Sequence, residues 1–178
     1  TIAAGTNLIF TAVLGGAGPF TYQWQKNGIV LSGATNATLT VAGAGVNDAG
    51  AYSVVATGPS GTFTSGVTHV AVMVPPRIIS HPQTQTVLRG ANVTLAVLTG
   101  GSALSYQWQL NGLNLDGATE NTLALPDVQT FQAGLYSVTV SIAVGTVVSS
   151  PASLTVLVPP SVMEIVSSAM ATNQLLQL

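Results

Sequence analysis

The stretch Tyr22-Gln-Trp24-Gln returns as Tyr106-Gln-Trp108-Gln, 84 residues further along (108 − 24), and this repetition decides the fold. Self-similarity at a fixed period marks repeated structural units. The chain has 178 residues, which is enough for two small domains. We therefore expect two tandem copies of one domain. The same offset relates other segments: Asn27-Gly28 and Asn111-Gly112, Gly33-Ala-Thr35 and Gly117-Ala-Thr119, Ala49-Gly50-x-Tyr52 and Ala133-Gly134-x-Tyr136, and Pro75-Pro76 and Pro159-Pro160.

Upstream of the tryptophans the offset changes by one residue. Gly5-Thr-Asn matches Gly90-Ala-Asn at an offset of 85 (90 − 5). The difference falls between two glycine-rich segments, residues 15–19 and 100–103. A one-residue insertion is what an exposed turn tolerates, so both segments are predicted to be surface loops.

Within each copy the apolar residues recur with a period of two. Residues 8–12 and 93–97 both alternate in this way, which is typical of half-buried strands. Asn-Gly follows each Trp-Gln-x and favours a two-residue hairpin turn, because both positions tolerate positive φ. Short strands with turn signals between them predict an all-β antiparallel sandwich. The further strands expected are residues 37–41, 52–56 and 63–74 in the first copy, and 121–125, 136–140 and 146–158 in the second.

Three features together resemble the cysteine-less bacterial immunoglobulin-like (Ig-like) repeats of large secreted and cell-surface proteins. They are the Tyr-x-Trp motif in the third strand, Asp48-x-Gly50-x-Tyr52 before the sixth, and the spacing between the two. The resemblance covers residues 5–158. It implies two tandem Ig-like antiparallel β-sandwiches plus a C-terminal extension.

The resemblance also implies a core. In antibody-type domains a tryptophan packs on a disulfide between the sheets, and a tyrosine two residues before the second cysteine bonds back to the backbone. This chain has no cysteine, so apolar side chains replace the bridge. Gln132 stands where the first copy has Asp48, which removes any buried ion pair expected there. The implied core residues are Phe10, Trp24, Tyr52 and Val54 in the first copy, and Leu95, Trp108, Tyr136 and Val138 in the second.

The two copies have unequal ends. Residues 1–75 form a first domain whose first strand is predicted to be missing, because only four residues precede its second strand. Residues 76–159 form a second domain that begins with a first strand divided by Pro82. Residues 160–178 are either the opening of a third β domain or a donor strand for the first domain of a neighbouring molecule. Apolar residues in this tail also fit a helical stripe.

Charged residues make up only 4% of the chain, and the net charge is −2. Nucleic acid is therefore an implausible partner, since its binding needs concentrated positive charge. Low charge leaves little repulsion between molecules, so self-association or contact with neighbouring Ig-like domains is expected. The apolar segment at residues 67–76 is too short to cross a bilayer, which takes about 20 apolar residues. Membrane insertion is not expected.

No catalytic, cofactor or metal site is predicted. His69 and His81 lie in different elements, far from any carboxylate in the sequence. Asn36-Ala-Thr38 and Asn92-Val-Thr94 match the glycosylation pattern, which arises often by chance in threonine-rich chains. The two tryptophans could stack on sugars, but their repeat position favours the core.

These observations favour a non-enzymatic structural module of an extracellular fibre, surface appendage or adhesin. Its domains would stack end to end through the Pro-Pro junctions, and strand complementation could polymerise it. The alternative is a carbohydrate- or protein-binding accessory region or spacer of a large secreted enzyme, which would bind a surface glycan or protein through loops such as residues 15–19. Both hypotheses place the chain outside the cell or at its surface.

Overall fold

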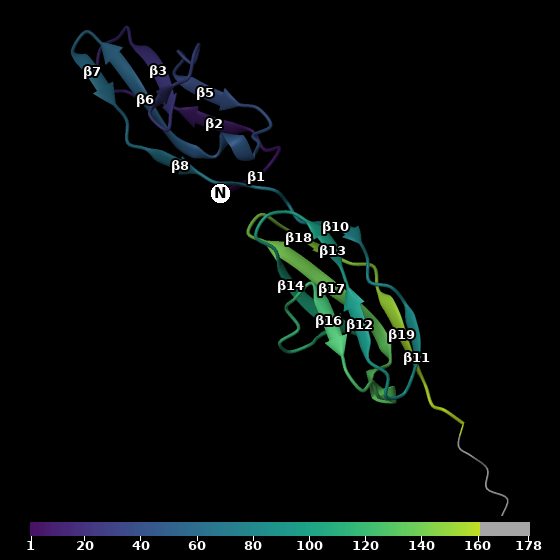
Figure 1. Ribbon diagram of the computed structural model, residues 1–178. Coiled ribbons are helices and arrows are strands. Elements are labelled where there is room, and N and C mark those ends of the chain that lie inside the picture. Colours follow the sequence, from purple (N-terminus) through teal and green to yellow (C-terminus); the bar gives the residue numbers. More distant parts are fainter. Residues whose placement is uncertain (161–178) are drawn as a thin grey trace, which may run out of the picture.

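The structure, a computed structural model, describes residues 1–160 and folds them into two β-sandwiches. Figure 1 shows one sandwich after the other, joined by the segment between β9 (Val72–Met73) and β10 (Arg77–Ser80). The only helices in residues 1–160 are two short 3-10 turns. The predicted all-β class with two tandem Ig-like sandwiches is confirmed. The alternatives for residues 161–178, a third domain, a donor strand or a helix, lie outside the described residues.

The second domain places strand pairs against a six-stranded sheet. β12 pairs with β16 and β10 with β13, and the facing sheet has the order β11-β19-β17-β14-β15, with β18 also bonded to β17. β11 and β19 run parallel, and the other pairs are antiparallel. The remaining bounds are β11 (Gln85–Leu88), β12 (Val93–Ala96), β13 (Leu98–Gly100), β14 (Ser105–Leu110), β15 (Leu113–Asn114), β16 (Thr122–Leu125), η2 (Thr130–Gln132), β17 (Gly134–Ile142), β18 (Gly145–Val148) and β19 (Ala152–Leu157).

The first domain repeats this arrangement with fewer strands. β2 pairs with β5, and the facing sheet has the order β4-β3-β6-β7, with β8 also bonded to β6. A short parallel pair, β1 with β9, accompanies them. The bounds are β1 (Ile2–Ala3), β2 (Leu8–Thr11), β3 (Thr21–Lys26), β4 (Ile29–Val30), β5 (Thr38–Val41), η1 (Val46–Asp48), β6 (Gly50–Gly58), β7 (Gly61–Thr64) and β8 (Thr68–Val70).

Local sequence accounts for the strands and their turns. In β12 the apolar residues Val93 and Leu95 are buried, while the residues between them are exposed, as the period of two predicts. The predicted Asn-Gly hairpins are confirmed. Asn27 and Gly28 both have positive φ, 52° and 77°, and join β3 to the antiparallel β4. This backbone twist matches the twist of the flanking strands.

The expectation that the first domain has no first strand needs correction. Ile2 and Ala3 form β1, which pairs in parallel with Val72 and Met73 of β9. The second domain pairs β11 with β19 in the same way. Residues 1–4 are sufficient for this short ladder. The strands of the second domain that have no counterpart strand in residues 1–75 are β10 and its partner β13.

The closing strands predicted at residues 63–74 and 146–158 are each interrupted. The first is divided into β7, β8 and β9, and the second into β18 and β19. At the break after β7, and at the equivalent break after β18, a serine hydroxyl replaces a backbone carbonyl as acceptor. Ser65 Oγ accepts the Val54 N–H at 3.0 Å, and Ser149 Oγ accepts the Val138 N–H at 3.0 Å. The chain can therefore leave the ladder without leaving a buried N–H unpaired.

Candidate functional site

The predicted core residues of the second domain surround its tryptophan. Trp108 is fully buried, and its indole Nε1 donates to the Glu120 backbone oxygen at 2.9 Å. Leu95, Tyr136 and Val138 are also buried and belong to the same apolar cluster. The one polar group of the ring thus has a partner inside the protein, as a buried tryptophan requires. Trp108 presents no face on which a sugar could stack.

The first domain places its predicted core residues at equivalent positions but covers them less completely. Trp24, Tyr52 and Val54 are buried, whereas Phe10 is only partly buried. The Phe10 ring stacks on Tyr52 with centroids 4.8 Å apart and is tilted against Trp24 at 5.8 Å. Trp24 Nε1 donates to the Asn36 backbone oxygen at 2.9 Å. The aromatic cluster occupies part of the space that aliphatic side chains fill in the second domain.

The expected tyrosine corner is present in both domains. Tyr52 Oη donates to the Asp48 backbone oxygen, and Tyr136 Oη to that of Gln132, each at 2.8 Å. Burial raises the pKa of both phenols, and the negative charge of Asp48 adds to the rise in the pKa of Tyr52. The Asp48 carboxylate accepts the Gly45 N–H at 2.8 Å. Gln132 Oε1 accepts the Gln129 N–H at the same distance, so an uncharged side chain orders this turn equally well.

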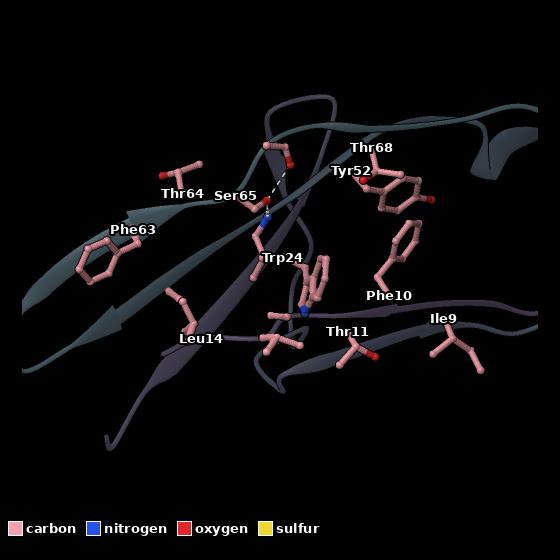
Figure 2. Close-up of a pocket in the computed structure, with 15 residues that line it drawn as sticks. Ile9, Phe10, Thr11, Leu14, Trp24, Tyr52, Phe63, Thr64, Ser65 and Thr68 are labelled. Atoms are coloured by element: carbon pink, nitrogen blue, oxygen red, sulfur yellow. Dashed lines mark hydrogen bonds between the residues drawn. The ribbon is translucent and has the colours of Figure 1, made fainter. Parts of the chain in front are cut away.

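A concave feature of the described residues is a groove on the first domain (Figure 2). Its cavity volume is about 470 Å³. One wall is β2 with the residues after it up to Leu14, and the other is residues 63–66 with Thr68. Trp24, Tyr52 and Val54 lie at its base, and no charged side chain lines it. We call this feature the edge groove. Its shape and lining suit an apolar or weakly polar extended ligand.

A second feature is the junction between the domains, where specific contacts join the two. Val74 and Ser102 are joined by two hydrogen bonds, from Ser102 N–H to the Val74 oxygen at 3.2 Å and from Val74 N–H to Ser102 Oγ at 3.4 Å. Gly101 has φ +142°, and a Cβ there would lie 3.1 Å from the Pro76 Cα and 3.2 Å from the Pro75 oxygen. The prolines therefore lie directly against a loop of the second domain. Only glycine fits this contact without displacement.

The two histidines lie in different environments. His81 Nδ1 accepts the Ser150 N–H at 3.0 Å, while His69 lies exposed on β8. Among residues 1–160 no group of three or more His, Asp or Glu side chains is placed to hold a metal ion. Both glycosylation motifs keep their asparagines exposed, at Asn36 and Asn92. No helix within residues 1–160 has the length and apolar character needed to cross a bilayer.

Comparison with known proteins agrees with this architecture. A family model described as "Immunoglobulin domain" matches residues 75–141. In solved structures, an I-band fragment of titin superposes with a TM-score of 0.67 at 22% identity, covering 89% of this chain and 62% of that one. The N-terminal eight Ig domains of Down syndrome cell adhesion molecule superpose at 0.71 and 20% identity, covering 87% and 23%. The fold is immunoglobulin-like. The tandem Ig-like arrangement is shared with these multi-domain proteins.

Two curated proteins share the Ig-like sequence at low identity. Muscle M-line assembly protein unc-89 of Caenorhabditis elegans is 28% identical over an alignment of 123 residues that covers 62% of this chain. Endoglucanase C of Cellulomonas fimi is 30% identical over an alignment of 173 residues that covers 90% of this chain. The chain spans only 2% and 16% of the lengths of these relatives. It therefore aligns with a small part of each.

Sequence reasoning missed the edge groove and the glycine-serine contact at the junction. The groove depends on what lies between β2 and β8, which no local pattern describes. One signal was present, since residues 76–85 of the second copy have no match among the residues of the first copy. The mismatch marked the place where the two sandwiches differ.

Proposed function

We propose that this chain is a non-enzymatic structural module of an extracellular fibre, surface appendage or adhesin, of the cysteine-less bacterial kind. The observation that carries the proposal is the junction. Two hydrogen bonds and the Gly101 contact hold Val74, Pro75 and Pro76 against the second domain. Proline also fixes φ in the connecting segment. A connection of this kind fixes the orientation of one domain relative to the next, which end-to-end stacking in a fibre requires.

We place the boundary of the two Ig-like domains at this junction, with domains at residues 1–75 and 76–159. Val158-Pro159-Pro160 repeats the sequence of the junction at the end of the second domain. The repetition supports a design in which each domain presents the same connection to the next. End-to-end stacking of Ig-like domains is then the natural assembly, and contacts with other Ig-like domains are the expected partnerships.

The junction proposal is tested with Gly101→Ala. The variant places a side chain in an unfavourable region of φ and against the prolines, so we expect the second domain to lose about 1–3 kcal/mol of stability and the interdomain distances to broaden. Small-angle scattering and spin-label distances between the domains measure the second effect. Gly16→Ala is the matched control, because Gly16 also has positive φ, +107°, but nothing lies within 4 Å of its added Cβ.

Equal distributions of interdomain distance for the wild type and Gly101→Ala would contradict a junction held by these contacts. The fibre role has its own test in electron microscopy of the purified native protein. Ordered filaments or rigid rods are expected, and dispersed molecules with freely bending domains would exclude the fibre assignment.

A second candidate is an accessory region or spacer of a large secreted enzyme. The observation that favours it is the alignment of 90% of this chain with part of Endoglucanase C. In this case residues 15–19, which lie in the loop between β2 and β3 of the first domain, would bind a glycan or protein ligand. Phe20 packs on Gly58 and holds one side of this loop, since a Cβ at Gly58 would lie 2.5 Å from the ring. Glycan-array binding that disappears when residues 15–19 are replaced by their counterparts, 100–103, would favour this function.

A further inference from the structure

The asparagine of the first Asn-Gly turn makes two hydrogen bonds to a single residue of the facing strand. The Asn27 backbone N–H donates to the Ala51 oxygen at 2.7 Å, and Asn27 Oδ1 accepts the Ala51 N–H at 2.8 Å. In an antiparallel ladder, two facing residues exchange both bonds through their backbones. The side-chain carbonyl of Asn27 thus takes the place of a backbone carbonyl at the point where the chain turns.

The second domain repeats this contact. The Asn111 N–H donates to the Leu135 oxygen at 2.8 Å, and Asn111 Oδ1 accepts the Leu135 N–H at 2.9 Å. A glycine precedes each facing residue. A Cβ at Gly50 would lie 2.8 Å from Asn27 Oδ1, and a Cβ at Gly134 would lie 2.7 Å from Asn111 Oδ1. Only glycine leaves room for the asparagine amide, and we call these two bonds with their glycine the turn clasp.

Asn-Gly is also a chemically reactive pair. The backbone nitrogen of the residue after an asparagine can attack the side-chain amide carbon, Cγ, and glycine hinders this attack least because it has no Cβ. Of the nine asparagines in the chain, only Asn27 and Asn111 precede glycine. Both turns are exposed, and nothing lies within 4 Å of a Cβ added at Gly28 or Gly112. Water therefore reaches both pairs.

The folded hairpin opposes this reaction. Closing the ring requires the asparagine Cβ and the glycine nitrogen to lie on the same side of the Cα–C bond. Asn27 and Asn111 have φ of 52° and 51°. In this left-handed region ψ is roughly +30 to +60°, which places the two atoms on nearly opposite sides of that bond. Because the clasp also holds the amide oxygen, the attack requires the turn to open.

We propose that Asn27-Gly28 and Asn111-Gly112 are sites of spontaneous covalent modification, which the turn clasps keep from reacting in the folded protein. When a turn opens, the glycine nitrogen loses its proton and attacks Cγ. The N–Cγ bond forms, the Cγ–Nδ2 bond breaks, and ammonia leaves with a proton equivalent to the one lost. Water then opens the cyclic imide at either carbonyl, which leaves aspartate or isoaspartate.

The modification changes both the charge and the turn. Each event adds one negative charge to a chain whose net charge is −2. Because low charge leaves little repulsion between molecules, each added charge makes self-association less favourable. Isoaspartate also lengthens the main chain by one carbon atom inside a two-residue turn, so the clasp is not restored in the same register. This inference does not depend on the fibre or adhesin role.

The first experiment compares the folded and unfolded wild-type chain. The full chain is incubated at mildly alkaline pH with and without urea, and peptide mapping by mass spectrometry follows the loss of each amide. We expect both sites to react more slowly in the folded chain by about tenfold or more, since reaction then requires local opening. Equal rates would overturn the proposal. So would faster reaction in the folded chain, because the bond to Oδ1 would then activate the amide.

The second experiment removes one clasp at a time. Gly50→Ala places a Cβ against the Asn27 amide and should raise the rate at Asn27 by about tenfold, the change in open population that loss of one hydrogen bond produces. The rate at Asn111 in the same molecules should stay unchanged, and Gly134→Ala should give the reverse pattern. Gly16→Ala is the matched control, because φ is also positive at Gly16 and nothing lies within 4 Å of its added Cβ.

Two results with these variants would also overturn the proposal. One is an unchanged rate at Asn27 in Gly50→Ala. The other is equal acceleration by Gly16→Ala and Gly50→Ala, because the rate would then follow the stability of the whole domain and not the clasp.

Discussion

The two domains share one sequence repeat, yet the second encloses its core and the first leaves one side open. At matched positions the second domain is the more buried: Trp108 is 0% exposed against 4% for Trp24, and Leu95 is 1% exposed where Phe10 is only partly buried. The main structural difference is the segment at residues 77–85. The comparison teaches that the repeated sequence specifies the two layers of each sandwich. The segment at residues 77–85 decides how completely the core between the layers is shielded from water.

The largest test of this comparison is truncation of the tryptophans. We expect Trp108→Ala to cost about 3–5 kcal/mol of unfolding free energy, because a cavity remains in a tightly packed shell. Trp24→Ala should cost less, about 3 kcal/mol or below, because the edge groove is lined by this ring and the new cavity would open into the groove. Denaturant unfolding followed by circular dichroism measures the loss. The fluorescence of the remaining tryptophan reports on the unmodified domain, and equal losses would contradict the difference in closure.

An exchange of core residues sharpens the comparison further. Leu95→Phe inserts a ring into a filled core and should cost about 1–3 kcal/mol through overpacking. Phe10→Leu removes the stack on Tyr52 and should cost about 0.5–1.5 kcal/mol. Chemical denaturation of each variant measures the two effects. A larger loss for Phe10→Leu than for Leu95→Phe would show that the first domain is the more tightly packed of the two.

The smallest expected effect is a loss of stability in alkali. The folded-state pKa of both corner tyrosines is raised above that of the unfolded chain, chiefly by burial. Their contribution is therefore complete below about pH 10, the ordinary tyrosine pKa, and is lost as the pH rises through the folded-state value. Urea midpoints measured from pH 8 to 11 should fall only in the upper part of this range. Tyr52→Phe and Tyr136→Phe should each reduce the slope, and an unchanged slope would exclude this linkage.

Much of the fold follows directly from the sequence. The period of two predicts β2 and β12, and Asn-Gly predicts hairpins because few other residue pairs accept positive φ twice. The tyrosine corner follows from the Ig-like pattern around Tyr52 and Tyr136. All of these depend on residues close together in the chain.

Features that depend on distant partners could not be predicted. The break at Ser65 arises because its hydroxyl reaches the Val54 N–H, 11 residues away in sequence. β1 exists because Val72 and Met73 lie beside Ile2 and Ala3. The edge groove depends on the spacing of two layers. The residue types alone do not indicate which distant residues come into contact.

The parallel ladders also determine how each domain carries mechanical load. Tension applied to the two ends of the second domain would pull β11 and β19 in opposite directions along their length. All four residue pairs, from Gln85↔Leu154 to Leu88↔Leu157, would then be sheared together rather than opened one at a time. The first domain meets the same tension with two pairs, Ile2↔Val72 and Ala3↔Met73. Under strain the first domain would therefore yield before the second.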